Sequence, residues 1–171
     1  MNSLTIIPKG PLRGTVHVPG DKSITHRALI LSALAEGSST LRGYCRGEDC
    51  LNTLSSLQQL GIPIEVEPDK VHVSGKGLWG LNEPAKPLDC GNSGTGLRLL
   101  TGVLAGQQFS SVLTGDASLR SRPMERIVKP LELMGAHIQG RNGGKLAPLA
   151  VIGSPLKGVE YVSPISSAQV K

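Results

Sequence analysis

Apolar residues along this chain follow helical and strand-like spacing in turn, and the alternation repeats. Between residues 51 and 61, leucines recur at every third position and the run ends at Gly61, which predicts an amphipathic helix closed by a C-terminal glycine. Residues 124–135 show comparable spacing and end at Gly135, with Pro123 at the predicted first turn. The two helices therefore look like copies of one element.

Two short segments follow each of these helices, and their apolar residues alternate with others. They lie at residues 62–66, 70–73, 136–139 and 149–152. A period of two is typical of strands that bury one face. Each helix is therefore expected to be followed by a pair of strands.

A segment rich in Ser and Thr opens each unit. Lys22 begins an apolar run that ends at Gly37, and Asn92, seventy residues later, begins a comparable run that ends at Gly106. Residues 166–171 look like the start of a third copy, seventy-four residues further on. Such self-similarity at a fixed period indicates a repeat architecture.

The coarse fold class that these patterns predict is α/β, with units of loop, helix, strand, helix, strand and strand. Two units are whole and a third has just begun. Their approximate bounds are 20–88, 89–158 and 159–171. Ahead of them, residues 3–7 and 14–18 are predicted to form two short strands, with Pro19-Gly20 as a hinge.

Composition narrows the classes of function. The chain has 171 residues, of which 39% are hydrophobic and 18% charged, so it is expected to be globular. Its longest apolar runs fall far short of the ~20 residues of a membrane span, and no membrane partner is expected. Three cysteines without a C-x-x-C pair argue against a disulfide framework or a metal site and fit a reducing cytoplasm.

The net charge of +5 requires an anionic partner. Nucleic acid is not expected, because aromatic residues make up only 2% of the chain and no run of Lys and Arg exceeds one residue. Small anionic metabolites fit better.

Cations gather at the predicted helix starts. They are Lys22, Arg27, Arg98, Arg120 and Arg122. A helix N-terminus presents free N–H groups and the positive end of the helix dipole to phosphate or carboxylate. Arginine suits a bidentate grip on such groups, whereas lysine acts as a movable point charge.

Each feature also fits a purely structural role when taken singly. Residues 91–96 fit a tight turn with a helix cap, Lys22 and Ser23 fit a solvated helix start, and Arg120 and Arg122 fit surface charges. Because unrelated surface residues have no reason to recur in phase with a repeat, their matching positions favour a ligand with several negative groups.

Other polar residues are expected to be structural. Glu48 and Asp49 are predicted to cap the helix that follows them. His26 is expected to be packed or hydrogen-bonded rather than to act as a general base, and the cysteines have no His partner that would support thiol chemistry. No pair of carboxylates looks like an acid/base couple.

Four motifs, in order and over the whole chain, resemble the 5-enolpyruvylshikimate-3-phosphate synthase family. They lie at residues 19–28, 91–98, 113–123 and 167–171. The resemblance implies an inside-out α/β barrel built of βαβαββ repeats. Residues 20–171 would be an incomplete substrate-binding domain, and residues 1–19 would supply strands to a second, absent domain. The chain is thus expected to be the N-terminal portion, inactive alone, because the family's acid/base residues lie in the second half.

The same resemblance implies a transferase of the shikimate pathway, which leads to chorismate and the aromatic amino acids in the cytoplasm. The 5-hydroxyl of shikimate 3-phosphate would attack phosphoenolpyruvate, and phosphate would leave the tetrahedral intermediate. No cofactor or metal is implied, and the partners would be the two substrates and the remaining C-terminal part of a monomeric enzyme.

Site residues carry over from the motifs by position, with Lys22 as the catalytic residue. Those implied for shikimate 3-phosphate are Lys22, Ser23, Arg27, Ser167, Ala168 and Gln169. Those implied for phosphoenolpyruvate are Lys22, Asn92, Gly94, Arg122 and Gln169. Some members have Ser where this chain has Ala168. Members insensitive to glyphosate have Ala where this chain has Gly94, so the complete enzyme is expected to be inhibited by glyphosate.

Two alternatives stay open at this point. The UDP-N-acetylglucosamine enolpyruvyl transferases share the fold, but they carry a reactive Cys five residues before the Arg, where this chain has Ala117. The other alternative is a stand-alone anion-binding or regulatory module, which would bind shikimate 3-phosphate without the rest of an enzyme.

Overall fold

The computed structural model describes residues 3–7, 10–11, 13–164 and 166–170. Its elements are α1 (Lys22–Leu34), β1 (Glu36–Arg42), α2 (Glu48–Gln59), β2 (Ile64–Val66), β3 (Lys70–Lys76), β4 (Leu88–Asp89), α3 (Gly94–Ala105), β5 (Ser110–Thr114), α4 (Ala117–Ser121), α5 (Glu125–Leu133), β6 (His137–Gly140), α6 (Arg141–Gly144) and β7 (Leu146–Ile152). Within those ranges, no helix has the length and apolarity needed to cross a membrane.

The predicted order of helix, strand, helix, strand and strand is found twice, and the fold class is α/β. The first unit runs from α1 to β3, and the second runs from α3 to β7 with three short additions, β4, α4 and α6. Of these, α6 is a tight turn rather than a regular helix, since Asn142 and Gly143 have φ values of 52° and 65°.

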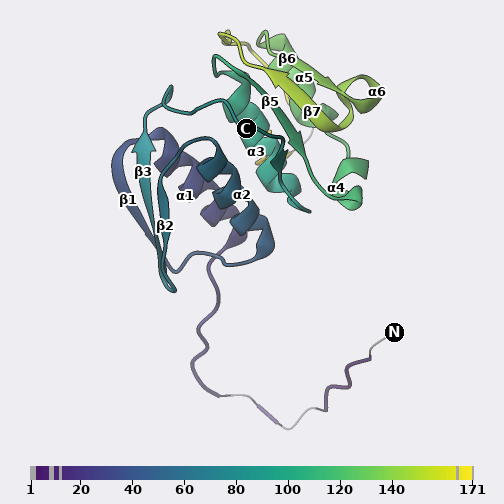
Figure 1. Cartoon of the computed structure of the whole chain (residues 1–171). Coiled ribbons are helices and arrows are strands. Elements are labelled where there is room, and N and C mark those ends of the chain that lie inside the picture. The colour runs from purple at the N-terminus through teal and green to yellow at the C-terminus, as the bar shows by residue number, and fades with distance from the viewer. Residues whose placement is uncertain (1–2, 8–9, 12, 165, 171) are drawn as a thin grey trace.

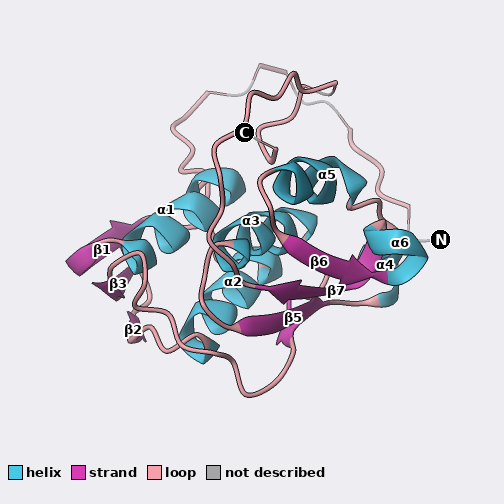
Figure 2. Ribbon diagram, turned by 90° about the horizontal axis from the view of Figure 1, so that it is seen from above, coloured by secondary structure: helices cyan, strands magenta, loops and turns pink. Residues whose placement is uncertain are grey.

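Each unit has its own sheet, and three helices lie between the two sheets (Figure 1). The first sheet is antiparallel in the order β1-β3-β2, and the second has the order β4-β5-β7-β6 with only β4 and β5 parallel. Helix α1 packs on β3 and α2, α2 packs on α3, and α3 packs on β5 and β7. Seen from above, α1, α2 and α3 again lie between the sheets (Figure 2).

Both predicted C-terminal glycines close their helices in the same way. Gly61 and Gly135 have φ values of 85° and 96°, a backbone conformation that glycine adopts without steric cost. The N–H of the residue after each glycine donates to the carbonyl five residues earlier. These bonds join Ile62 to Leu57 (3.1 Å) and Ala136 to Leu131 (2.9 Å). The repeat therefore extends to the hydrogen bonds of the helix ends.

Some predicted boundaries are wrong by a few residues. The first helix stops at Leu34, and Gly37 already belongs to β1. Pro123 precedes the N-cap Met124 instead of lying in the first turn of α5.

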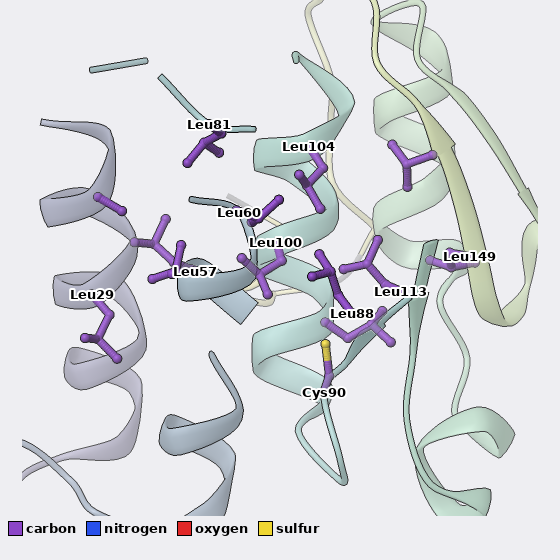
Figure 3. Close-up of a cluster of buried hydrophobic side chains, with 14 of the residues drawn as sticks. Leu29, Leu57, Leu60, Leu81, Leu88, Cys90, Leu100, Leu104, Leu113 and Leu149 are labelled. Carbon is purple, nitrogen blue, oxygen red and sulfur yellow. The ribbon is translucent and has the colours of Figure 1, made fainter. Parts of the chain in front are cut away.

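The core is one continuous cluster of leucines and other apolar side chains that runs from the first sheet through the helices to the second sheet. Figure 3 shows Leu29 of α1, Leu57 of α2 and Leu100 of α3 pointing into it, with Leu113 of β5 and Leu149 of β7 beyond. All five are at most 1% exposed. The burial of this cluster fixes the helices, and hence their N-termini, relative to one another.

The two predicted N-terminal strands are not present. Residues 3–7 and 14–18 form no strand, and Ile6 and Val16 are 81% and 82% exposed. An extended segment becomes a strand only when a neighbour pairs with its backbone, and no described strand lies beside this one (Figure 1). The alternating pattern identified extended backbone without identifying a partner.

Candidate functional site

A carboxylate from α2 holds the lysine at the N-terminus of α1. Asp21 is the N-cap of α1, and its side chain accepts a hydrogen bond of 2.7 Å from the N–H of Ile24. The ammonium of Lys22 lies 2.9 Å from Oδ2 of Asp49. The hydrogen bond and charge of Asp49 raise the pKa of Lys22, so the ammonium stays charged at neutral pH.

Asp49 therefore has a role that differs from the helix cap predicted from the sequence. It lies in the first turn of α2 as expected, but the N-cap is Gly47 and no side chain caps that helix. Its oxygen instead orients Lys22 from 27 residues away.

The N-terminus of α3 is built by the predicted glycine-rich loop. Ser93 is the N-cap, wholly buried, and its hydroxyl accepts a hydrogen bond of 3.0 Å from the N–H of Gly96. Gly94, the first helical residue, is buried below the guanidinium groups of Arg98 and Arg122. A Cβ at Gly94 would lie 2.9 Å from Nη1 of Arg98.

Arg122 joins the short helix α4 to this loop. Its guanidinium donates to the backbone carbonyl of Asn92 (3.3 Å), to the side-chain carbonyl of Asn92, and to Oγ of Ser118 (3.2 Å). The amide of Asn92 in turn donates to Oδ2 of Asp116 at 2.6 Å. The N–H of Leu119 and the amide of Asn92 lower the pKa of Asp116, which keeps it ionised.

Arg98 is not free to grip a ligand in the way its position suggests. The side chain is 8% exposed and donates to the carbonyl of Gly94 (3.3 Å), to Oε1 of Gln169 (2.9 Å) and to the carbonyl of Pro123 (3.1 Å). Burial, together with the charges of Arg126 and Arg122, lowers its pKa. Arg98 therefore links three segments of the protein.

Residues 166–170 lie across the N-termini of α1 and α3. Arg27 donates to the carbonyl of Ala168 (3.0 Å), and the amide of Gln169 donates to Oγ1 of Thr95 (3.2 Å). Ser167 accepts from the N–H of Gln169 at 3.3 Å. In Figure 2 the C-terminal end lies beside α1 and α3, as these bonds require.

The expected site residues lie on separate elements, and residues 166–170 form hydrogen bonds with both α1 and α3. Lys22, Ser23 and Arg27 are on α1, Asn92 and Gly94 are at the start of α3, and Arg122 follows α4. The third segment reaches this group through Ala168 and Gln169, while Lys171 lies outside the described residues. Arg120 is exposed on α4, and its carbonyl accepts from Arg141 at 2.9 Å.

Thiol chemistry finds no support at this site. Cys45, Cys50 and Cys90 are all free, and burial is the main reason that the pKa values of Cys50 and Cys90 rise to about 12. Among the described residues, no group of His, Cys, Asp and Glu is arranged to hold a metal ion.

Comparison with known proteins shows which family the sequence resembles. The family model "EPSP synthase (3-phosphoshikimate 1-carboxyvinyltransferase)" matches residues 6–171. The chain is 55% identical over 171 residues to a 3-phosphoshikimate 1-carboxyvinyltransferase of Citrifermentans bemidjiense, covering 100% of this chain and 40% of the relative. It is 58% identical over 160 residues to one of Alkaliphilus metalliredigens, covering 94% and 38%.

The fold agrees as well. The EPSP synthase of Acinetobacter baumannii superposes with a TM-score of 0.88 and 49% sequence identity, covering 92% of this chain and 36% of that one. The chain spans about 40% of the length of the curated relatives it matches. With a family model that matches nearly every residue and relatives above half identity, this chain belongs to the EPSP synthase family.

Proposed function

We propose that this chain is the N-terminal part of a 3-phosphoshikimate 1-carboxyvinyltransferase and supplies binding groups for both of its substrates. Its role would be to hold shikimate 3-phosphate and phosphoenolpyruvate while the 5-hydroxyl of the first attacks the second. The observation that carries the proposal is the convergence of three segments, from α1, α3 and residues 166–170, through the bonds of Arg27 and Arg98.

The shikimate 3-phosphate subsite would lie at the start of α1. Ser23 and Arg27 follow Lys22 on that helix, and Ala168 is held against Arg27 at 3.0 Å. Free N–H groups at a helix N-terminus and a nearby guanidinium are the groups that bind a phosphate monoester. Ser167 and Gln169 would complete this subsite from the C-terminal segment.

The phosphoenolpyruvate subsite would lie at the start of α3. Arg122 and Asn92 are bound to each other, Gly94 lets the guanidinium groups of Arg98 and Arg122 lie close to the helix start, and Gln169 is fixed by Arg98. Lys22 would serve both subsites, with its charge maintained by Asp49.

These residues would contribute to the reaction through their positive charges. Two polyanions must approach each other before a bond forms, and cations already in place offset the repulsion and stabilise charge that develops on the phosphate that leaves. We assign to Lys22 the contact with the reacting atoms. The acid and base groups would come from the C-terminal part of the complete enzyme, so the 171-residue chain alone should release no phosphate from the two substrates.

The larger architecture forms part of the same proposal. The two units would be repeats of an inside-out barrel, at about 20–88 and 89–158, with a third that starts at 159–171. Helices lying between two sheets support that arrangement. Residues 1–19 would pair in the second domain, which would explain why the described part of this segment is unpaired here.

The test is phosphate release from phosphoenolpyruvate and shikimate 3-phosphate by the complete enzyme, compared with the variant Arg122→Ala. Loss of the arginine should raise the KM for phosphoenolpyruvate at least tenfold, since a charge-assisted contact contributes about 1.5–3 kcal/mol. Lys86→Ala, which removes an exposed positive charge from the loop before β4, serves as the control. Absence of any phosphate release from the complete enzyme would refute the proposal.

A further inference from the structure

A buried histidine connects the helices that carry the two proposed subsites. His26 of α1 is 0% exposed. Its Nδ1 lies 2.8 Å from Oγ1 of Thr53 on α2, and its Nε2 lies 3.5 Å from Oγ of Ser93, the N-cap of α3. One imidazole ring therefore spans three helices, two of which begin at the candidate site.

The neighbouring hydrogen bonds decide which nitrogen carries the proton. The hydroxyl of Thr53 lies 3.4 Å from the carbonyl of Asp49, to which it can donate, so we assign it as the acceptor from His26 and Nδ1 as the donor. Ser93 already accepts from the N–H of Gly96 at 3.0 Å, which leaves its own proton for Nε2. A neutral ring with the proton on Nδ1 satisfies both hydroxyls.

The charge state agrees with this assignment. Burial is the main cause that lowers the pKa of His26, and the cations Lys22 and Arg27 lower it further, while Asp49 acts in the opposite direction. These three are the charged groups that face the ring from α1 and α2.

The two hydroxyls pack closely against Gly96. A Cβ on Gly96 would lie 2.7 Å from Oγ1 of Thr53 and 3.0 Å from Oγ of Ser93. Only glycine fits there while both hydroxyls stay on the ring.

The bonds form one continuous line from the start of α3 to the start of α2. At one end, Ser93 lies between Asn92 and Gly94 of the phosphoenolpyruvate subsite. At the other end, Asp49 holds the ammonium of Lys22 at 2.9 Å.

We propose that His26 is a positioning residue: as the neutral ring protonated on Nδ1, it fixes the loop of Asn92 and Gly94 relative to α1 and so keeps the phosphoenolpyruvate subsite in register with Lys22. This inference rests on the function proposed above. His26 touches neither substrate, and its effect passes through Ser93 and Thr53.

Two variants of the complete enzyme separate the two ring contacts. In His26→Asn the amide nitrogen can replace Nδ1 as a donor but cannot reach Ser93, whereas in His26→Gln the amide oxygen can replace Nε2 as the acceptor of the Ser93 proton. We expect His26→Asn to raise the KM for phosphoenolpyruvate about fivefold, the value of one buried hydrogen bond. His26→Gln should stay within about twofold of wild type, and the KM for shikimate 3-phosphate should change less than twofold in both.

A control separates positioning from loss of stability. Val151→Ala opens a cavity in β7, where the side chain is 0% exposed and distant in sequence from the site residues. It should lower the melting temperature without changing either KM. Unchanged KM values in His26→Asn, or equal rises for both substrates in that variant, would overturn the proposal.

A spectroscopic measurement keeps the proposal testable if a variant does not fold. The ring nitrogens of ¹⁵N-histidine in the wild-type complete enzyme should report a neutral ring with the proton on Nδ1 at pH 7.5. A proton on Nε2, or a charged ring, would contradict the assignment. This readout does not require turnover, so it separates failure of the inference from failure of the proposed function.

Discussion

Replacing Gly94 by alanine tests the geometry of the site with a single methyl group. The added Cβ would lie 2.9 Å from Nη1 of Arg98 and 3.5 Å from Nη1 of Arg122. The first distance is too short for van der Waals contact, so the guanidinium of Arg98 must move. Because that group is 8% exposed and bound to three acceptors, it cannot swing into water.

The magnitude follows from the bonds that the movement weakens. A shift of Arg98 also moves Gln169, which it holds, and crowds Arg122, so the complete enzyme should lose about one contact with phosphoenolpyruvate. A hydrogen bond from a charged group contributes about 1.5–3 kcal/mol, and the lower value corresponds to roughly tenfold in affinity. Alanine also favours a helix over glycine by up to about 1 kcal/mol, which offsets part of the cost to folding. Gly94→Ala should therefore raise the KM for phosphoenolpyruvate about tenfold with little change in melting temperature.

The assay is steady-state phosphate release by the complete enzyme at saturating shikimate 3-phosphate. Gly102→Ala is the matched control, since Gly102 lies on the same helix and a Cβ there would meet nothing within 4 Å. Wild type and Gly102→Ala should be inhibited by glyphosate, and Gly94→Ala should be less sensitive. A KM for phosphoenolpyruvate within twofold of wild type in Gly94→Ala would refute the reasoning.

Three further outcomes are expected. Because the pKa of His26 is lowered in the folded protein, the unfolded chain binds more protons below the ordinary pKa of 6.5, so stability should fall as the pH drops through that value. The free energy of unfolding, measured with urea, should change less between pH 7.5 and pH 5.5 in His26→Gln than in wild type. An equal change in both proteins would contradict the buried neutral ring. Cys50 and Cys90, whose pKa values are about 12, should resist a thiol reagent at pH 8 until the protein is unfolded, and rapid reaction of either in the folded protein would argue against their burial. Asp116→Ala removes the N-cap of α4 and the acceptor for Asn92, and should raise the KM for phosphoenolpyruvate several-fold; an unchanged KM would mean that Asn92 is held by Arg122 alone.

Periodicity was sufficient to predict the units, their helices and most of their strands. The helices that end at Gly61 and Gly135 are closed by hydrogen bonds between residues five apart. Because these interactions are local, the sequence pattern alone is enough to predict them. The N-terminal strands do not form within this chain, because a strand needs a partner and the alternating pattern at residues 3–7 does not name one. Their pairing in a second domain stays a prediction.

The difference between local and long-range contacts also explains which parts of the site could not be predicted from the sequence. Motifs placed Arg98 at the correct helix, but its acceptors Pro123 and Gln169 lie 25 and 71 residues away, and only the folded chain reveals that they occupy its donors. The contacts of His26 with Thr53 and Ser93 span 27 and 67 residues and have no local signature.

The bond from Arg27 to Ala168 closes a loop of 141 residues. Closing so long a loop carries an entropy cost that the contacts of the C-terminal segment must offset. An anion bound between α1 and this segment favours the closed form by mass action, and at a concentration one hundred times its dissociation constant it adds about 2.7 kcal/mol to stability. Binding of such an anion would then also slow proteolysis of the C-terminal segment.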